Sequence, residues 1–366
     1  MRKTYDFLEI TYLSKILLLL LLLLCFLGFM MQYSAGGGYF ATYSASYLLK
    51  ALIGFIILFL FYRLDIKLLF LLTDYFYYLS LFLLVLVELV GVHRLGAQRW
   101  LSLGLFVIQP SEIMKIAIVL MLSKHFHQFS VSQIGRLRFY LIPICFSLAP
   151  FLLIAMQPDL GTALLFVFVA AVLFFLAGFR MVYISAIIGS IVVMGPIIWM
   201  FILHSYQKNR ILTFLNPNRD PLGQGYHIIQ SKIAIGSGGF WGKGFLIGTQ
   251  GQLDFLPEKN TDFIFTLLSE EFGFLGGIFL IFIYSSVILI TTIMSYRAPY
   301  AFGRYVIVGF NTMFFLYIFI NIGMVSGLLP VVGVPLPFIS FGGTSMVTQM
   351  IAFGIILNIE NNKHYI

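Results

Sequence analysis

The sequence predicts an all-α polytopic integral membrane protein with ten transmembrane helices, and two observations carry this prediction. The 366 residues are 60% hydrophobic and only 10% charged, whereas an ordinary soluble domain is about 45–50% apolar and about 25% charged. Apolar segments of about 20 residues, the length that crosses the hydrocarbon core of a bilayer, recur along the chain. This composition excludes a soluble globular fold, and it excludes disorder, which requires low hydrophobicity.

Ten segments are expected to span the membrane and to form a single domain over residues 1–366. The first follows Arg2 and Lys3, as the apolar part of a signal peptide would. Its apolar run from Ile16 to Met31 is long for a signal peptide and no Ala-x-Ala cleavage site follows, so we expect a retained anchor. The ten segments are 15–33, 46–63, 68–91, 110–126, 138–156, 160–179, 181–204, 266–295, 301–326 and 342–360.

Lysine and arginine are distributed unevenly between the connecting loops, and cytoplasmic loops carry the excess. The short loops on one side contain only Arg94 and Arg99. Both termini are therefore expected in the cytoplasm, and the loops near 34–45, 92–109, 157–159, 205–265 and 327–341 are expected outside. The cytoplasmic side receives Arg2, Lys3, Arg63, Lys67, Lys124, Arg136, Arg138, Arg180, Arg297, Arg304 and Lys363.

The segment 205–265, between the seventh and eighth spans, is a large extracytoplasmic loop in this topology. Long loops are translocated largely regardless of charge, so its six basic residues do not reverse the orientation. Its content of Ile, Phe, Tyr and Trp argues against disorder. We expect it to pack on the outer mouth of the helix bundle, partly as interfacial helix. The six basic residues are Lys208, Arg210, Arg219, Lys232, Lys243 and Lys259.

Polar groups within or beside spans are costly and suggest function by default. Glu112 and Lys115 lie three residues apart in the run QPSEIMK at 109–115, which places them on one face of a helix. A structural ion pair and a substrate contact both remain open for these two. Asp159, in the turn between two spans, either caps the next helix or lines a polar cavity.

Asp262 opens a long apolar helix at its outward end. Thr261 is a suitable cap, which would leave Asp262 in the first turn, where the helix dipole favours a carboxylate. An ionised carboxylate at the membrane surface can also act as a general base, and both interpretations remain open. Glu270 and Glu271 lie two turns deeper and are expected to face protein or water.

Two segments are rich in glycine or proline. Five glycines between Gly236 and Gly244 indicate either tight turns or a nest of backbone N–H groups that binds an anion, with Lys243 adding charge. The run 321–345 contains three prolines and several glycines. Such broken backbone is tolerated at membrane depth only when it is buried in protein or lines a cavity, so this run is expected to form the wall of an outer vestibule.

The net charge, the two cysteines and the missing motifs limit the classes of function that the sequence allows. The net charge of +8 favours anionic lipids and an anionic substrate rather than nucleic acid. Cys25 and Cys145 are expected to be free thiols. The sequence contains no arrangement for Ser/His/Asp catalysis, zinc binding or a Walker motif. The residues alone therefore leave two function classes open, an enzyme that acts on a lipid-linked phosphate and a transporter that moves one.

Three long motifs then make the sequence recognisable. They are GYHIIQSKIAIGSGG at 225–239, the stretch 256–271 with LPE, DFIF and EE, and the signature 321–345. With QPSEIMK and QPDLGTA, they closely resemble the SEDS family (shape, elongation, division and sporulation). The form VVGVPLP at 331–337 resembles the rod-shape branch of that family more than the division branch.

The resemblance implies the SEDS fold and a peptidoglycan glycosyltransferase that polymerises lipid II during lateral cell-wall elongation and rod-shape maintenance. It places the chain in the bacterial cytoplasmic (inner) membrane with an extracytoplasmic active site. It also implies a divalent cation (Mg or Mn), with unknown ligands, and a class B penicillin-binding protein transpeptidase as partner. A lipid II flippase and a non-catalytic scaffold of the elongation complex are the alternatives.

The family's essential carboxylate corresponds to Asp262, which is expected to be the general base on the acceptor 4-hydroxyl while undecaprenyl pyrophosphate leaves. Single displacement then inverts the donor from an α-linkage to a β-linkage. Six residues are expected to contact the substrate: Glu112, Lys115, Arg210, Lys243, Gln230 and Ser231.

Overall fold

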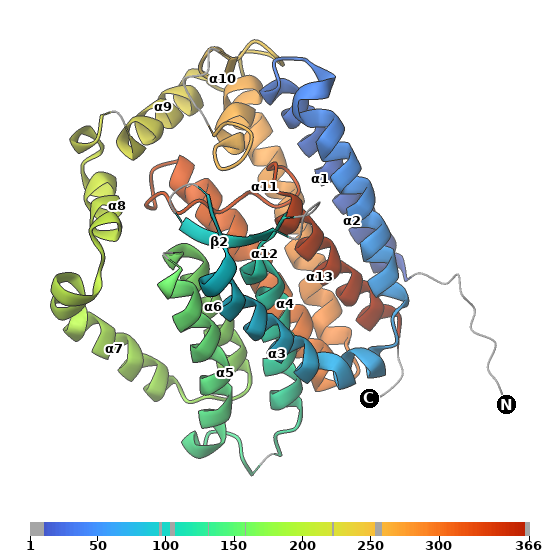
Figure 1. Cartoon of the computed structure of the whole chain (residues 1–366). Coiled ribbons are helices and arrows are strands. Elements are labelled where there is room, and N and C mark those ends of the chain that lie inside the picture. Colours follow the sequence, from blue (N-terminus) through green and yellow to red (C-terminus); the bar gives the residue numbers. More distant parts are fainter. Residues whose placement is uncertain are drawn as a thin grey trace.

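The structure is a computed structural model that describes residues 11–94, 97–102, 107–130, 132–157, 159–221, 223–252 and 258–362. Over these residues the chain is almost entirely helical (Figure 1). The α-helices are α1 (Tyr12–Ala35), α2 (Ala45–Arg63), α3 (Ile66–Val90), α4 (Pro110–His127), α5 (Leu137–Met156), α6 (Leu160–Leu176), α7 (Met181–Ile197), α8 (Ser205–Leu215), α9 (Gln224–Ser237), α10 (Thr249–Gln252), α11 (Ile264–Arg297), α12 (Ala301–Val325) and α13 (Gly343–Asn361).

Each of the ten predicted spans coincides with a helix. Six helices of the described chain are long and apolar enough to cross a membrane: α1, α2 with the preceding turn, α3, α5, α11 and α12. Helices α6 and α7 are apolar but shorter. Helix α4 carries Glu112, Lys115 and Lys124, and α13 carries Gln349 and Asn358. The fold is therefore that of a multi-pass membrane protein, and the total of ten spans stays a prediction.

Helix α4 lies inside the bundle, which explains why it tolerates charge. Its side chains from Pro110 to Ser123 are nearly all buried, and it packs against α3, α5, α6, α12 and α13. Charged residues on a helix of this kind face protein instead of lipid. Helix α12 is similarly central, because it contacts α4, α6, α9, α11 and α13.

The two ends of the bundle are distinct. At one end the start of α1 meets the end of α13, where the backbone N–H of Thr11 donates to Oδ1 of Asn361 at 3.0 Å. At the other end the predicted outward loops meet, for example where Nε of Arg99 donates to the carbonyl of Gln157 at 3.1 Å. The assignment of this second end to the outside of the cell stays a prediction.

A small antiparallel sheet in the 92–109 loop was not predicted. Strand β2 (Ala97–Ser102) pairs with β1 (Val92–Arg94) on one side and with β3 (Val107–Ile108) on the other. The pairing fixes the position of Arg99, which lies on β2. The sheet is an addition to the predicted all-α fold, and it carries a charged residue to the end of the bundle where the loops gather.

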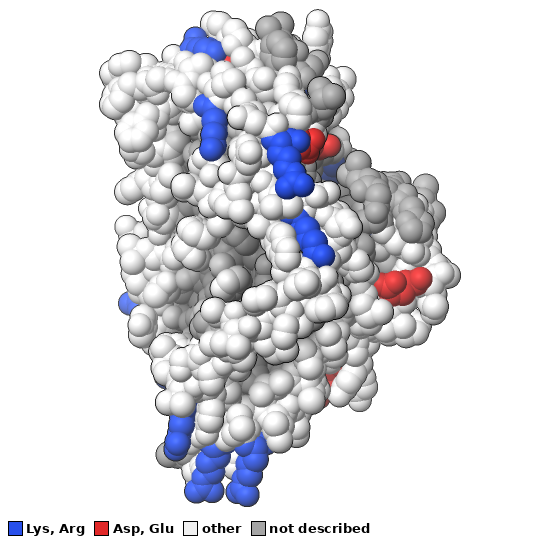
Figure 2. Space-filling view, turned by 90° about the vertical axis from the view of Figure 1, so that its left-hand side faces the viewer, with Lys and Arg blue, Asp and Glu red and all other residues white. Residues whose placement is uncertain are grey.

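The described residues of the segment 205–265 are folded, as its apolar content predicted. It contains α8, the 3-10 turn Pro217–Arg219, α9 and α10. Helix α9 packs on α11 and α12. Helices α7, α8 and α9 form an arch along one flank of the bundle (Figure 1). Most described side chains of α7 are exposed. Figure 2 views this flank, which is hollowed near its middle and carries Lys and Arg at its lower end and along its upper half.

Candidate functional site

Asp262 lies in the turn that precedes α11, two residues before the helix begins at Ile264. The expectation that Thr261 caps this helix is wrong: the N-cap position is Phe263, which makes no side-chain cap hydrogen bond. Thr261 instead donates its Oγ1 to Oε2 of Glu258 at 2.8 Å. The backbone N–H of Phe263 donates to the carbonyl of Glu258 at 3.2 Å. Residues 258–263 therefore form a closed turn, here called the Asp262 turn.

The Asp262 carboxylate is half-buried, beside the loop that follows α12. A Cβ placed on Gly333 of that loop would lie 3.4 Å from Oδ2 of Asp262. The pKa of Asp262 is raised from its ordinary value of 3.8 to about 6, because burial, the largest cause, and the negative charge of Glu258 both raise it while the positive charge of Arg210 opposes them. A carboxylate with this pKa is a stronger base than an ordinary aspartate, yet it remains mostly ionised at neutral pH.

The loop from 327 to 342 contains no helix or strand. Side chains from the neighbouring helices donate hydrogen bonds to its backbone carbonyls. Tyr284 of α11 donates to the carbonyl of Pro337 at 2.6 Å, and Tyr47 of α2 donates to the carbonyl of Phe338. Residues 336–340 are buried. Residues 327–333 are partly buried or exposed, and the expectation that this run forms the wall of an outer vestibule stays a prediction. We name residues 327–342 the proline loop.

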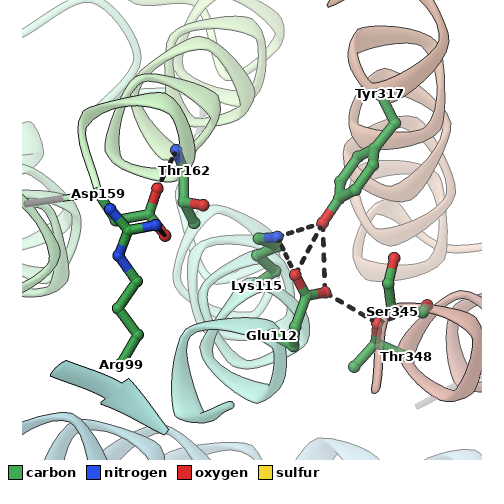
Figure 3. A network of polar contacts seen from close by, with 8 residues as sticks. All are labelled: Arg99, Glu112, Lys115, Asp159, Thr162, Tyr317, Ser345 and Thr348. Atoms are coloured by element: carbon green, nitrogen blue, oxygen red, sulfur yellow. Dashed lines mark hydrogen bonds and ion pairs between the residues drawn. The ribbon is translucent and has the colours of Figure 1, made fainter. Parts of the chain in front are cut away.

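Arg99 and Arg210 lie close enough for their charges to interact, and Arg210 also interacts with Asp262. Nη1 of Arg99 is 3.8 Å from Oδ2 of Asp159, and Asp159 also caps α6 by accepting from the backbone N–H of Thr162 at 3.3 Å (Figure 3). Burial and the like charge of Arg99 lower the pKa of Arg210, while Asp159 and Asp262 raise it. A guanidinium stays protonated at neutral pH, so these groups form one mixed cluster of positive and negative charges around Asp262.

Glu112 and Lys115 form a buried ion pair deeper in the bundle (Figure 3). Nζ of Lys115 is 2.6 Å from Oε1 of Glu112 and also donates to the hydroxyl of Tyr317. Tyr317 lies 3.2 Å from both carboxylate oxygens of Glu112, and Thr348 donates to Oε2 at 3.2 Å. The two charges are thus mutually neutralised by groups from α4, α12 and α13, which favours a structural role.

Lys243 is also engaged within the protein. Its Nζ lies 2.8 Å from Oε1 of Glu270, which is fully buried on α11. Oxygens of the same carboxylate accept from the backbone N–H groups of Gln250 and Gly251 at 2.9 and 3.1 Å. These contacts favour a structural role for Lys243 over direct substrate binding, because the cation fastens the glycine-rich loop to α11.

The glycine-rich loop does not form a free nest of donors. The backbone N–H groups of Lys243 and Gly244 donate to the carbonyls of Glu270 and Glu271, both at 3.0 Å. A Cβ on Gly242 would approach the carbonyl oxygen of Glu271 to 2.1 Å. The glycines therefore allow two backbones to touch where α11 is kinked at Gly273, which has a φ of 64°. These contacts do not support the interpretation of the glycine-rich loop as an anion site. They support the alternative interpretation, tight turns.

Gln230 and Ser231 lie on α9. The hydroxyl of Ser231 is buried between helices, 2.7 Å from Oγ1 of Thr266 and 2.8 Å from the carbonyl of Val325. Ser231 thus joins α9 to α11 and α12, while Gln230 is half-buried. Of the residues expected to contact substrate, the structure brings Arg210 near Asp262 and places Ser231, Lys243 and the Glu112–Lys115 pair in packing contacts.

Sequence reasoning missed several polar residues that hold this region together. Tyr317 of α12 contacts Glu112 of the buried ion pair, and Asn321 of the same helix contacts the Asp262 turn. Gln32 of α1 also contacts the Asp262 turn. Each is a polar side chain within an apolar span, which is the signal that could have found it. Arg99 was considered only for topology.

The structure describes no group of three or more His, Cys, Asp or Glu side chains that could hold a metal ion. Mg²⁺, however, commonly uses one or two protein carboxylates and completes its shell with water and substrate phosphates. Glu258 lies close enough to Asp262 for its negative charge to raise the pKa of Asp262. Two neighbouring carboxylates fit that donor set.

Comparison with known proteins places the chain in a family. A sequence profile of the cell cycle proteins FtsW, RodA and SpoVE matches residues 14–365. The peptidoglycan glycosyltransferase MrdB of Escherichia coli K12 is 44% identical over 295 residues, which cover 80% of this chain and 78% of MrdB.

Two solved structures share the fold over 98% of this chain and 99% of their own. A chain from a peptidoglycan synthase complex, whose structure concerns the coordination of polymerization and crosslinking, has a TM-score of 0.83 and 30% identity. The rod shape determining protein RodA of Thermus thermophilus has a TM-score of 0.74 and 25% identity. The resemblance to the SEDS family is thereby confirmed, and the chain belongs to the FtsW/RodA/SpoVE family of cell cycle proteins.

Proposed function

We propose that this multi-pass membrane protein is a peptidoglycan glycosyltransferase that polymerises lipid II during lateral wall elongation and so maintains rod shape. Its similarity to MrdB, a peptidoglycan glycosyltransferase, and to the rod shape determining protein RodA supports this activity and role. The single observation that carries the mechanism is Asp262, a half-buried carboxylate with a raised pKa beside Arg210.

The proposed reaction is one displacement at the anomeric carbon of the donor sugar. Asp262 accepts the proton of the acceptor 4-hydroxyl, and that oxygen forms the new glycosidic bond. The bond from the anomeric carbon to pyrophosphate breaks, and undecaprenyl pyrophosphate leaves with the bonding electrons. Attack from the opposite face inverts the configuration, so one base suffices, unlike the two-carboxylate arrangement of glycosidases.

The leaving pyrophosphate requires positive charge where its own charge develops. Arg210 is the cation whose charge reaches Asp262, and Arg99 lies in the same cluster. The Asp262 and Glu258 carboxylates would hold a divalent cation (Mg or Mn), which would supply further positive charge for the leaving pyrophosphate. Because Lys243 and the Glu112–Lys115 pair are engaged elsewhere, we assign the substrate contact first to Arg210.

We place the chain in the bacterial inner membrane as a single domain, with both termini cytoplasmic and the 205–265 segment and Asp262 outside. A class B penicillin-binding protein is the proposed partner, which would crosslink the strands that this protein polymerises. The similarity to a chain from a peptidoglycan synthase complex supports an assembly of this kind.

The experiment is polymerisation of labelled lipid II by the purified full-length protein with its partner and Mg or Mn. The proposal predicts a ladder of glycan chains on a gel, and no ladder with Asp262→Ala. A flippase would transfer labelled lipid II between bilayer leaflets without forming a ladder. A non-catalytic scaffold would form none and would restore rod shape in cells even as the Asp262→Ala variant.

A further inference from the structure

The Asp262 turn presents three consecutive carbonyl groups to three different parts of the protein. The carbonyl of Asn260 accepts from the side-chain amide of Gln32 at 3.0 Å. The carbonyl of Thr261 accepts from the hydroxyl of Ser340 at 2.6 Å. The carbonyl of Asp262 itself accepts from the side-chain amide of Asn321 at 3.0 Å.

Each amide bridges the Asp262 turn to the proline loop. Nε2 of Gln32 also donates to the carbonyl of Ile339 at 2.9 Å. Nδ2 of Asn321 also donates to the carbonyl of Val334 at 2.7 Å. Each nitrogen thus uses its two hydrogens on two carbonyls, one on either segment. Since both neighbours of each nitrogen are acceptors, the reversed orientation would place oxygen against oxygen.

Both amides are fully buried and lie on helices of the bundle. Gln32 and Asn321 are 0% exposed, on α1 and α12 respectively. A buried carbonyl that loses its donor carries a desolvation penalty of about 1–3 kcal/mol. The carbonyl of Asn260 also accepts from the backbone N–H of Phe341 at 2.8 Å, so this penalty falls on the carbonyls of Asp262, Val334 and Ile339. The two amides therefore reinforce the direct contacts that Ser340 and Phe341 of the proline loop make with the Asp262 turn.

We propose that Gln32 and Asn321 are positioning residues for the reaction of Asp262, because their amides fasten the Asp262 turn to the proline loop. This inference rests on the proposed function. Gly333 of the proline loop lies beside the carboxylate, so the spacing of the two segments sets both where the carboxylate lies and how much water reaches it.

The chain offers a matched control on the same helix. Nδ2 of Asn311 donates to the carbonyl of Ile288 at 3.2 Å and to Oγ1 of Thr292 at 2.9 Å, both on α11. Asn311 is ten residues from Asn321 along α12, or about 15 Å at 1.5 Å per residue. Asn311→Leu removes two hydrogen bonds of a half-buried α12 amide to α11 without touching the Asp262 turn.

The test compares Asn321→Leu, Gln32→Met and Asn311→Leu in the full-length protein with its partner and lipid II. We expect Asn321→Leu and Gln32→Met to lower kcat about tenfold to a hundredfold, as misplacement of a reacting group by about 1 Å does, with KM changed less than about twofold. Asn311→Leu should leave kcat unchanged.

Wild-type kcat in folded Asn321→Leu and Gln32→Met would overturn the inference, as would equal effects of Asn311→Leu. If Asn321→Leu does not fold, the kcat of Gln32→Met alone tests the inference. Asp262→Asn in the same series separates the two proposals. If the wild type forms no glycan ladder, the proposed function has failed. If Asp262→Asn polymerises at the wild-type rate, the role of Asp262 as base has failed; if it is inactive and the amide variants behave as wild type, only the positioning role has failed.

Discussion

Tyr317 and Asn321 lie one turn apart on α12, and each contacts one of the two polar centres of the protein. The hydroxyl of Tyr317 lies 3.2 Å from Glu112, and the amide of Asn321 donates to the carbonyl of Asp262 at 3.0 Å. Residues four apart share one face of a helix. The buried ion pair and the proposed catalytic turn are therefore held by the same face of one central helix.

Polymerisation should lose activity as the pH falls through about 6. The pKa of Asp262 is raised to about 6, and a general base acts only when it is deprotonated. The rate should approach a tenfold loss per pH unit below that value and stay level between pH 7 and 8. The measurement is kcat for lipid II from pH 5 to 8. A rate that is unchanged at pH 5 would contradict the assignment.

The same pKa predicts a pH-dependent effect on stability. A raised pKa in the folded state means that the contribution of Asp262 to the free energy of unfolding is fully present below its ordinary value of 3.8 and is lost as the pH rises through about 6. Asp262→Asn should therefore raise Tm in detergent at pH 8 and leave it nearly unchanged at pH 4. A variant that is destabilised at pH 8 would show instead that the ionised carboxylate stabilises the fold.

Lys115→Met should destabilise the protein strongly. It leaves the Glu112 carboxylate buried with only the Tyr317 and Thr348 hydroxyls as donors, and breaking one side of a buried ion pair typically costs about 3–5 kcal/mol. Adding Glu112→Gln removes the isolated charge, so the double variant should recover part of the lost Tm. A folded Lys115→Met protein with wild-type Tm and reduced polymerisation would favour a substrate contact.

Gly242→Ala should lower Tm more than Gly239→Ala. Both glycines have positive φ, 83° and 55°, so an alanine is strained at either position by about 1–2 kcal/mol. A Cβ on Gly242 would also meet the carbonyl of Glu271 at 2.1 Å, whereas a Cβ on Gly239 would have nothing within 4 Å. Thermal unfolding of the two variants checks this. Equal shifts in Tm would show that the contact between the loop and α11 is not tight.

The sequence was sufficient to predict the helices that coincide with the expected spans, because hydropathy is a local property. Ile16 to Met31 lies within α1, and the break at 327–342 separates α12 from α13. Asp262 could be located for the same reason, as a carboxylate next to a long apolar helix. The short sheet around Arg99 escaped prediction because its strands have two to six residues.

Contacts between distant segments could not be predicted. Gln32 and Ile339 are 307 residues apart in sequence, and no local pattern announces that their groups meet. The glycine-rich loop illustrates the same limit, since its composition suits both an anion site and a close backbone contact. Only the position of Glu270 and Glu271 opposite the loop decides between them.

The most direct test of the central claim is the initial rate of chain formation by Asp262→Asn, which keeps the size of the side chain and removes the base. Removing a positioned general base typically lowers rates by about 10²–10⁴-fold. We expect a loss of at least a hundredfold at pH 7.5, with folded protein shown by thermal unfolding and partner binding retained. A rate within twofold of the wild type would contradict the claim that Asp262 takes the proton from the acceptor sugar.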